Sequence, residues 1–287
     1  FLACSSTSNI AVDILFVTAF NMGVAGAAVA TVIGQIVAGT AACIINLKAN
    51  TEIHFRIKGF RPDGKIIGLI YEVGIPSIIM QSIGSVMTYG MNKILLGFSS
   101  TAAAVFGVYF KLQSFIFMPV FGLNNGMVPI IAYNYGAGKR ERMMKTLKLS
   151  ILYAVILMLI GFLVFQVMPD SLLGLFDASE TMLAIGRPAL RIISISFLLA
   201  GFSIVCGSMF QALGNGVYSM LVSIARQLIV LLPVAYLLSR TGNIDMVWWA
   251  YPIAELVSGG LTIFFLVRIY RNVIVHICEP ENEIVTR

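Results

Sequence analysis

Five ionisable side chains stand inside or beside apolar stretches that are long enough to cross a lipid bilayer: Asp13, Lys93, Lys111, Arg226 and Glu255. An ionisable group inside a membrane helix costs a few kcal/mol on insertion scales, so proteins keep such groups mainly where they bind, pair or conduct. These five residues are therefore the first candidates for chemistry in this chain.

Asn9 and Asp13 are separated by four residues, which places both on one face of a helix. A carboxylate and a carboxamide on one face are suited to Na⁺ or to a proton. The alternative is structural: a cap at a helix end, or a polar pair packed against a neighbouring helix.

Lys93 and Lys111 lie near the ends of two apolar runs joined by a short turn. Each either extends its ammonium group toward the membrane surface or lines a cavity. Arg226 lies about ten residues into its run, too deep for that extension, and Glu255 is the natural partner for it. We expect the two to be neighbours, with either a structural or a substrate-binding role.

The elements that position these residues follow from composition. The chain is 59% hydrophobic and 11% charged, with a mean hydropathy of +0.93, which excludes a soluble globular enzyme. Its charges separate long apolar runs instead of alternating with apolar residues, so helices and not barrel strands are predicted to span the membrane. The sequence predicts an all-α polytopic membrane protein with about eight spans, near 2–20, 24–47, 75–98, 102–134, 147–168, 188–213, 217–239 and 247–270.

Basic residues gather in the loop between the second and third spans, in the loop between the fourth and fifth, and after the eighth. If eight helices alternate, all three segments face one side, which the positive-inside rule makes the cytoplasm. No nucleic-acid partner is needed to explain the net charge of +6. We predict two helices in 1–49, a cytoplasmic linker at 50–72 that forms either a surface segment or an interfacial helix, a six-helix bundle at 73–272 and a cytoplasmic tail at 273–287.

Other chemistry is not indicated. The four cysteines and two histidines are far apart in sequence, so no disulfide framework and no metal site other than one for Na⁺ is expected. The chain also lacks the Ser, metal-protease and nucleotide-binding motifs that would favour an enzyme or a bound cofactor.

The stretch from Gly122 to Arg140 contains Gly122-Leu-Asn-Asn-Gly126 and Asn134-Tyr-Gly-Ala-Gly138, and it resembles multidrug and toxic compound extrusion (MATE) transporters of bacterial type. Further stretches agree with that family: Asn9 and Asp13 with Thr31 downstream, Gly74-Ile-Pro76, Gln211-Ala-Leu-Gly214, Arg226-Gln227 and Pro252-Ile-Ala-Glu255. The resemblance covers essentially the whole chain.

The resemblance implies a twelve-helix, two-lobe transporter of which roughly the first four helices are absent from this sequence. The last six helices would then form one complete lobe. The family exports organic cations and amphipathic compounds in exchange for Na⁺ or H⁺. Carried over from one branch of it, the coupling site in this chain is Asn9, Asp13 and Thr31.

Methionine and aromatic side chains can contact the apolar parts of many different substrates. Each such residue could instead face lipid or another helix. The candidates are Met80, Met87, Met91, Tyr109, Phe115 and Met118. We therefore expect a monomeric efflux antiporter of the plasma membrane that acts on small organic substrates. A lipid-linked saccharide flippase of the same superfamily, for which Lys93, Lys111 and Arg226 are suited, and a non-transporting scaffold are the alternatives.

Overall fold

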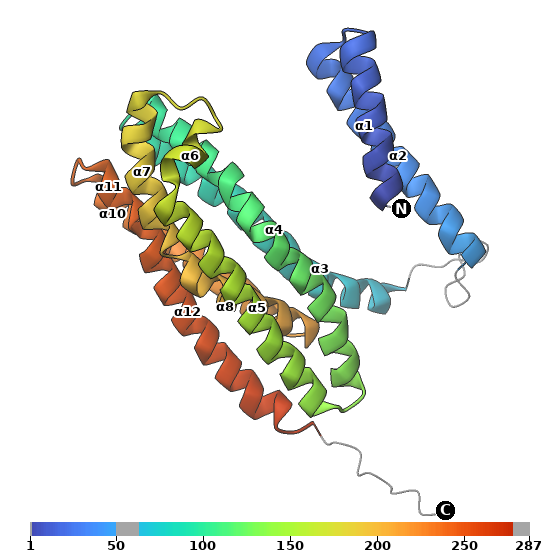
Figure 1. Ribbon diagram of the computed structural model, residues 1–287. Coiled ribbons are helices and arrows are strands. Elements are labelled where there is room, and N and C mark those ends of the chain that lie inside the picture. The colour runs from blue at the N-terminus through green and yellow to red at the C-terminus, as the bar shows by residue number, and fades with distance from the viewer. Residues whose placement is uncertain (1, 50–62, 278–287) are drawn as a thin grey trace, which may run out of the picture. The chain divides into compact units, whose positions relative to one another are not determined.

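The structure is a computed structural model that describes residues 2–49 and 63–277, and all regular elements in these two ranges are helical (Figure 1). The chain divides into two compact units, Phe1–Gly64 and Lys65–Arg287. The prediction of an all-α protein is therefore confirmed.

The N-terminal unit is a helical hairpin. α1 (Leu2–Ile14) continues into the short π-helical segment η1 (Leu15–Ala19), and α2 (Gly23–Ala49) packs back along both. The reversal uses left-handed backbone at Asn21 (φ 49°) and at Gly23 (φ 54°), where glycine carries no steric penalty. A side chain at Gly26 would lie 3.1 Å from the backbone of Phe16, so glycine allows the two arms of the hairpin to approach closely.

The C-terminal unit is a helical bundle. Its long helices are α3 (Gly64–Leu96), α4 (Ser100–Gly136), α5 (Arg140–Val167), α8 (Phe197–Ala212) and α12 (Ala250–Ile269). Shorter elements connect them: α6 (Pro169–Gly174), α7 (Glu180–Ser194), α9 (Gly216–Ile224), η2 (Ala225–Leu231), α10 (Leu232–Ser239), α11 (Ile244–Trp248) and η3 (Tyr270–Ile274). α3 begins at Gly64, so part of the segment predicted as a linker is helical, and residues 50–62 lie outside the described residues.

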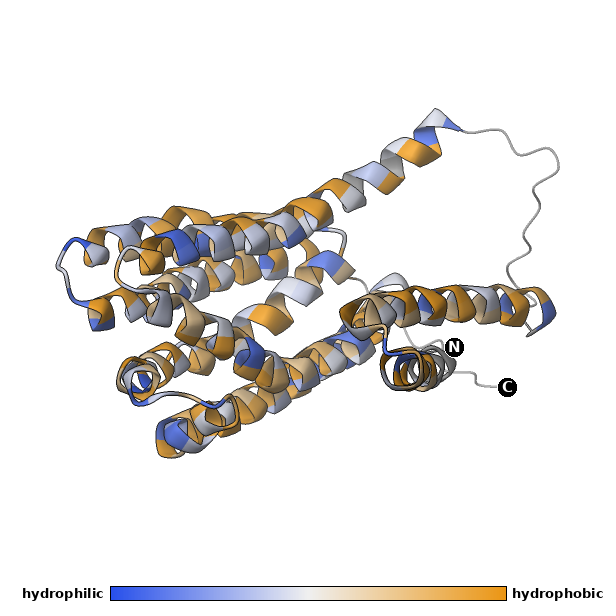
Figure 2. Ribbon diagram, turned by 90° about the horizontal axis from the view of Figure 1, so that it is seen from above, coloured by the Kyte–Doolittle hydropathy of each residue, from blue (hydrophilic) through white to orange (hydrophobic). Residues whose placement is uncertain are grey.

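Five helical stretches in the described residues are long and apolar enough to cross a membrane, or six if the pair α7 and α8, bent by 50°, forms one span. They match six of the eight predicted spans. The first predicted span corresponds to α1 and η1, whose apolar part is the shorter Asn9–Ala19, and the third lies on α3. Figure 2 shows apolar residues along most of each helix, with polar residues at the ends and at some positions within the helices.

Close helix packing holds the core of the bundle together. α5 runs along α4 and α8, and a side chain at Gly201 would lie 2.9 Å from the carbonyl oxygen of Ala154. Phe117 and Phe165 each meet Phe197 edge-on, with ring centroids 5.3 and 5.2 Å from it. This arrangement buries aromatic surface between α4, α5 and α8.

One end of the bundle joins segments that are far apart in sequence. Arg140, at the start of α5, donates a hydrogen bond to the Tyr270 hydroxyl at 2.9 Å and lies over the Tyr270 ring. The turn between α4 and α5 therefore lies at the same end of the bundle as the end of α12. The two basic segments that sequence analysis placed on one side are adjacent here.

The helix that carries Arg226 changes its winding. Regular α-helix in α9 gives way to a π-helical segment from Ala225 to Leu231, followed by Pro233 in the first turn of α10. Proline has no N–H and its ring collides with the carbonyl four residues earlier, so the preceding turn must widen or bend. Widened turns of this kind occur often at functional sites.

Candidate binding cavity in the C-terminal unit

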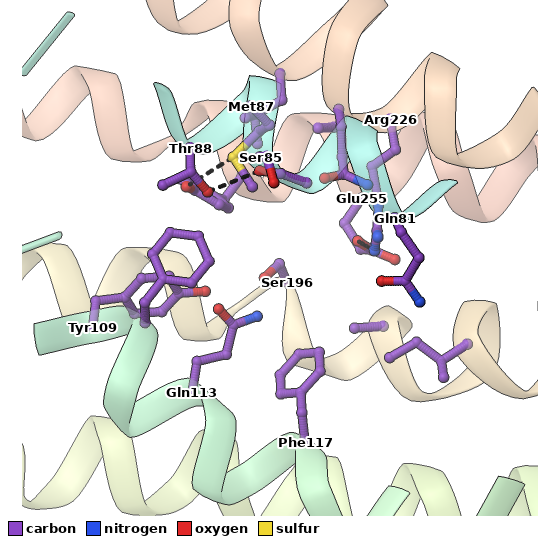
Figure 3. Close-up of a pocket in the computed structure, with 18 of the residues that line it drawn as sticks. Gln81, Ser85, Met87, Thr88, Tyr109, Gln113, Phe117, Ser196, Arg226 and Glu255 are labelled. Carbon is purple, nitrogen blue, oxygen red and sulfur yellow. Dashed lines mark hydrogen bonds and ion pairs between the residues drawn. The ribbon is translucent and has the colours of Figure 1, made fainter. Parts of the chain in front are cut away.

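The C-terminal unit contains a partly open cavity of about 740 Å³ between α3, α4, α8, η2 and α12. This volume lies within the range of small-molecule binding sites. Figure 3 shows side chains from several of these helices pointing into it. We call it the main cavity.

Two helices present regularly spaced side chains to the main cavity. On α3 the polar residues Gln81, Ser85, Thr88 and Asn92 follow one another at intervals of four, three and four, which is one helical face. On α4 the lining residues recur every four positions: Tyr109, Gln113, Phe117 and Phe121. One wall is therefore rich in amide and hydroxyl groups, and the other is mainly aromatic.

Arg226 and Glu255 form an ion pair at the edge of the main cavity, with Arg226 Nη1 3.3 Å from Glu255 Oε2. The Arg226 side chain is 28% exposed and the Glu255 side chain 6%. The second carboxylate oxygen, Oε1, is buried and has no hydrogen-bond partner among the described residues. The neighbours expected from sequence are thus brought together, but the carboxylate retains unused capacity to accept a hydrogen bond or a cation.

Local sequence explains why the pair reaches this position. The π-helical turn carries Arg226 and Gln227 side by side in sequence, and both line the main cavity. Across from them Gly84 has no side chain, and a β-carbon there would lie 4.0 Å from Gln227 Oε1. On α12 the residues Tyr251, Ala254 and Glu255 share one face, as their spacing requires.

Aromatic rings surround the inner part of the cavity. Tyr109 and Tyr251 meet edge-on with centroids 5.9 Å apart, and Phe106 stands behind both. The Tyr251 hydroxyl also donates a weak hydrogen bond to the sulfur of Met87 at 3.9 Å. Aromatic faces in a cavity that also holds a carboxylate provide the surroundings that an organic cation prefers.

The six substrate candidates occupy different places. Met87 and Tyr109 line the main cavity, while Met80 lines a second, smaller cavity beside it. Met91 is fully buried in the core of the bundle. Phe115 and Met118 are 71% and 64% exposed on α4 and line neither of these two cavities.

The two lysine candidates do not line the main cavity. Lys93 is exposed in the last turn of α3. Lys111 is exposed on α4, with its ammonium nitrogen 5.7 Å from the centre of the Phe176 ring. Among the described residues, the charged groups that line this cavity are Arg226 and Glu255.

The N-terminal unit carries the predicted coupling residues. Asn9 and Asp13 lie one turn apart on α1, both half-buried, and Asp13 Oδ1 is buried without a hydrogen-bond partner among the described residues. Thr31 is exposed on α2, where its hydroxyl donates to the carbonyl of Ala27 at 2.9 Å.

Sequence analysis missed most of the polar lining, which includes Gln81, Gln113 and Ser196. The available signal was the single polar face of α3 within an otherwise apolar run. Ser196 gave no such signal, because its position depends on the break between α7 and α8.

The chain is similar to known transporters. It is 29% identical over 258 residues to the multidrug export protein MepA of Staphylococcus haemolyticus, a match that covers 90% of this chain and 57% of the relative. The chain therefore spans just over half the length of that relative.

Solved structures share the fold. A MOP superfamily transporter from Pyrococcus furiosus aligns with a TM-score of 0.83 at 23% identity, over 93% of this chain and 61% of the other. A mutant of the VcmN MATE transporter of Vibrio cholerae aligns with a TM-score of 0.85 at 20% identity, over 95% and 62% of the two chains.

Residues 76–237, more than half of this 287-residue chain, match the MatE family model. The matched region contains α4, α5 and α8 and reaches through the π-helical turn at Arg226. The resemblance seen in the sequence is thereby confirmed, and the chain belongs to the MatE family of membrane transporters.

Proposed function

We propose that this protein exports organic cations and other amphipathic compounds from the cell in exchange for Na⁺ or H⁺, by alternating access. The observation that carries the proposal is the main cavity, whose lining combines the Glu255 carboxylate with the paired rings of Tyr109 and Tyr251. Its aromatic wall can bind the apolar parts of different substrates, and its carboxylate favours a substrate with a positive charge.

The charge balance of the cavity supports a cationic substrate. Arg226 neutralises Glu255 only through one contact of 3.3 Å, longer than the 2.7–2.9 Å usual for a charge-assisted bond. Oε1 has no partner among the described residues. A cation entering the cavity can therefore interact with Glu255 without first replacing a strong hydrogen bond.

For coupling we propose Asn9, Asp13 and Thr31. The support is the buried, unpartnered Asp13 Oδ1 on a helix that packs along α2, where Thr31 lies. We further propose that the protein is a monomer in the plasma membrane with its basic loops and C-terminus in the cytoplasm. The contact between Arg140 and Tyr270, which joins two basic segments at one end of the bundle, supports this orientation.

A lipid-linked saccharide flippase is less well supported. Such a protein needs several cations around a pyrophosphate, whereas the main cavity offers one guanidinium that already contacts a carboxylate. Lys93 and Lys111 do not line this cavity.

To test this, the protein is reconstituted in vesicles with an imposed Na⁺ or H⁺ gradient. We expect a fluorescent organic cation to move against its own gradient, and Glu255→Gln to weaken its binding. A matched control is Leu256→Ala, which changes the exposed neighbour of Glu255 on α12. Movement of a lipid-linked sugar without movement of the cation would refute the proposal.

A further inference from the structure

The amide side chains of the main cavity have unused hydrogen-bonding capacity. Among the described residues four carboxamides line it: Gln81 and Asn92 on α3, Gln113 on α4 and Gln227 on η2. None of the four makes a hydrogen bond to another described residue. Each carboxamide offers two N–H donors and one carbonyl oxygen that accepts. The walls of the cavity therefore present donors and acceptors that are available to a ligand.

Two hydroxyl groups of the same cavity behave differently. The Thr88 hydroxyl donates to the carbonyl of Gly84 at 2.8 Å, and the Ser196 hydroxyl donates to the carbonyl of Ile193 at 2.7 Å. These two donors are used within their own stretch of chain. The carboxamide donors on the neighbouring turns are not, so they are the stronger candidates for contact with a ligand.

The carboxamide residues reach the open part of the cavity. Gln81 is exposed, and Asn92, Gln113 and Gln227 are half-buried. Figure 3 shows Gln81 from α3 and Gln113 from α4 pointing into the space between the two helices. Without a ligand, water satisfies such accessible groups, and a ligand that displaces this water without replacing its hydrogen bonds loses affinity.

The position of the amides defines the shape of a matching ligand. Gln81 and Asn92 are eleven residues apart on α3, so they lie about 16 Å apart along its axis. On α4, Gln113 is followed on the same face by the rings of Phe117 and Phe121. A ligand that matches both walls has a flat apolar body for the rings and hydrogen-bonding groups along one edge for α3.

We propose that the main cavity selects its substrate through these carboxamides, and that the substrate is a flat aromatic compound with several carbonyl or hydroxyl groups along one edge. A carboxamide donates to a carbonyl, and it either donates to a hydroxyl or accepts from one. A compound without such groups leaves the amides unpaired and binds more weakly. The positive charge of the substrate rests on the proposed function, but selection by hydrogen bonds does not.

The experiment measures binding of three probes to the protein in lipid nanodiscs by isothermal titration calorimetry, with empty nanodiscs as the blank. Doxorubicin is a cation with several hydroxyl and carbonyl groups on flat fused rings. Tetraphenylphosphonium is an aromatic cation without any hydrogen-bonding group, and methylumbelliferyl glucoside is a neutral aromatic compound with several. We expect doxorubicin to bind about tenfold more tightly than tetraphenylphosphonium, as the loss of two or more hydrogen bonds implies.

Two variants on different helices, Gln81→Met and Gln113→Met, remove an amide and keep the length of the side chain. Each should weaken binding of doxorubicin by about threefold to tenfold. Binding of tetraphenylphosphonium should be unchanged or tighter, which also shows that the variant is folded. Ser114→Ala is the control, because it removes a polar group next to Gln113 that does not line the cavity. If either variant loses its helical circular dichroism, Asn92→Leu replaces it.

No loss for doxorubicin in folded variants, equal losses for both cations, or no binding of any probe would overturn the inference. The neutral probe separates the inference from the proposed function. Binding of the glucoside that depends on Gln81 and Gln113, in a protein that binds neither cation, would leave selection by the amides intact and refute cation export. Export of both cations that neither Gln→Met variant alters would do the reverse.

Discussion

The ion pair between Arg226 and Glu255 leads to a prediction about stability: replacing Arg226 should cost more than replacing Glu255. Removing one partner of a buried pair costs about 3–5 kcal/mol, because the other charge is left without compensation. The side chains are 28% and 6% exposed, and Arg226 borders both cavities. An orphaned Arg226 can be hydrated, whereas an orphaned Glu255 cannot be hydrated to the same extent.

We therefore expect Glu255→Gln to lower the free energy of unfolding by only about 1–2 kcal/mol, since Gln keeps an acceptor for Arg226 and the guanidinium retains some solvent. Arg226→Met should cost about 3 kcal/mol, because it leaves a nearly buried carboxylate without its counter-charge. In the double variant no orphaned charge remains, so its cost should fall below the sum of the single costs by about 1–3 kcal/mol.

The assay is reversible unfolding by SDS in mixed micelles, followed by far-UV circular dichroism, on both single variants and the double variant. Leu256→Ala serves as the control, since Leu256 is 64% exposed on the same helix and adjacent to Glu255. A larger cost for Glu255→Gln than for Arg226→Met would refute the argument from exposure. Strictly additive costs would show that the pair is not energetically coupled.

Three further predictions concern other parts of the chain. Asp13→Asn should abolish ion-driven efflux in vesicles while leaving the circular dichroism spectrum unchanged, because the side chain keeps its shape and loses its charge; efflux with normal ion dependence would make Asp13 structural. Gly201→Ala should lower the free energy of unfolding by about 1–3 kcal/mol, since the new methyl group lies 2.9 Å from the Ala154 carbonyl, whereas Gly122→Ala, where nothing lies within 4 Å, should not destabilise. Lys93→Met together with Lys111→Met should leave binding of an organic cation, measured by fluorescence titration, unchanged, because neither residue lines the main cavity; a marked loss of affinity would contradict the assignment of that cavity.

The sequence predicted the helical architecture well, because the apolar runs are long and the charges between them are few. It also predicted the pairing of Arg226 with Glu255, since a deep charge in a membrane needs a partner. It did not place the start of α3, which begins at Gly64 in a segment of mixed polar and apolar residues.

It was harder to predict whether an individual side chain faces lipid, the core or a cavity. Met91, Phe115 and Met118 are chemically similar, yet the first is buried and the others are exposed. A helix that is apolar on every side gives no periodicity from which to tell the side that faces lipid from the side that faces a cavity. Polar residues in such helices are more informative, as the face of α3 with Gln81, Ser85 and Thr88 shows.

The π-helical segment from Ala225 to Leu231 has a consequence for how this protein tolerates change in its gene. A π-helical turn is an α-helical turn with one residue inserted. Deleting one residue there would restore regular winding and rotate Arg226 by about 100° relative to α10, away from Glu255. The cavity thus depends on the register of the chain as much as on residue identity, so a single-codon deletion in this segment should separate Arg226 from Glu255 even where the deleted residue does not line the cavity.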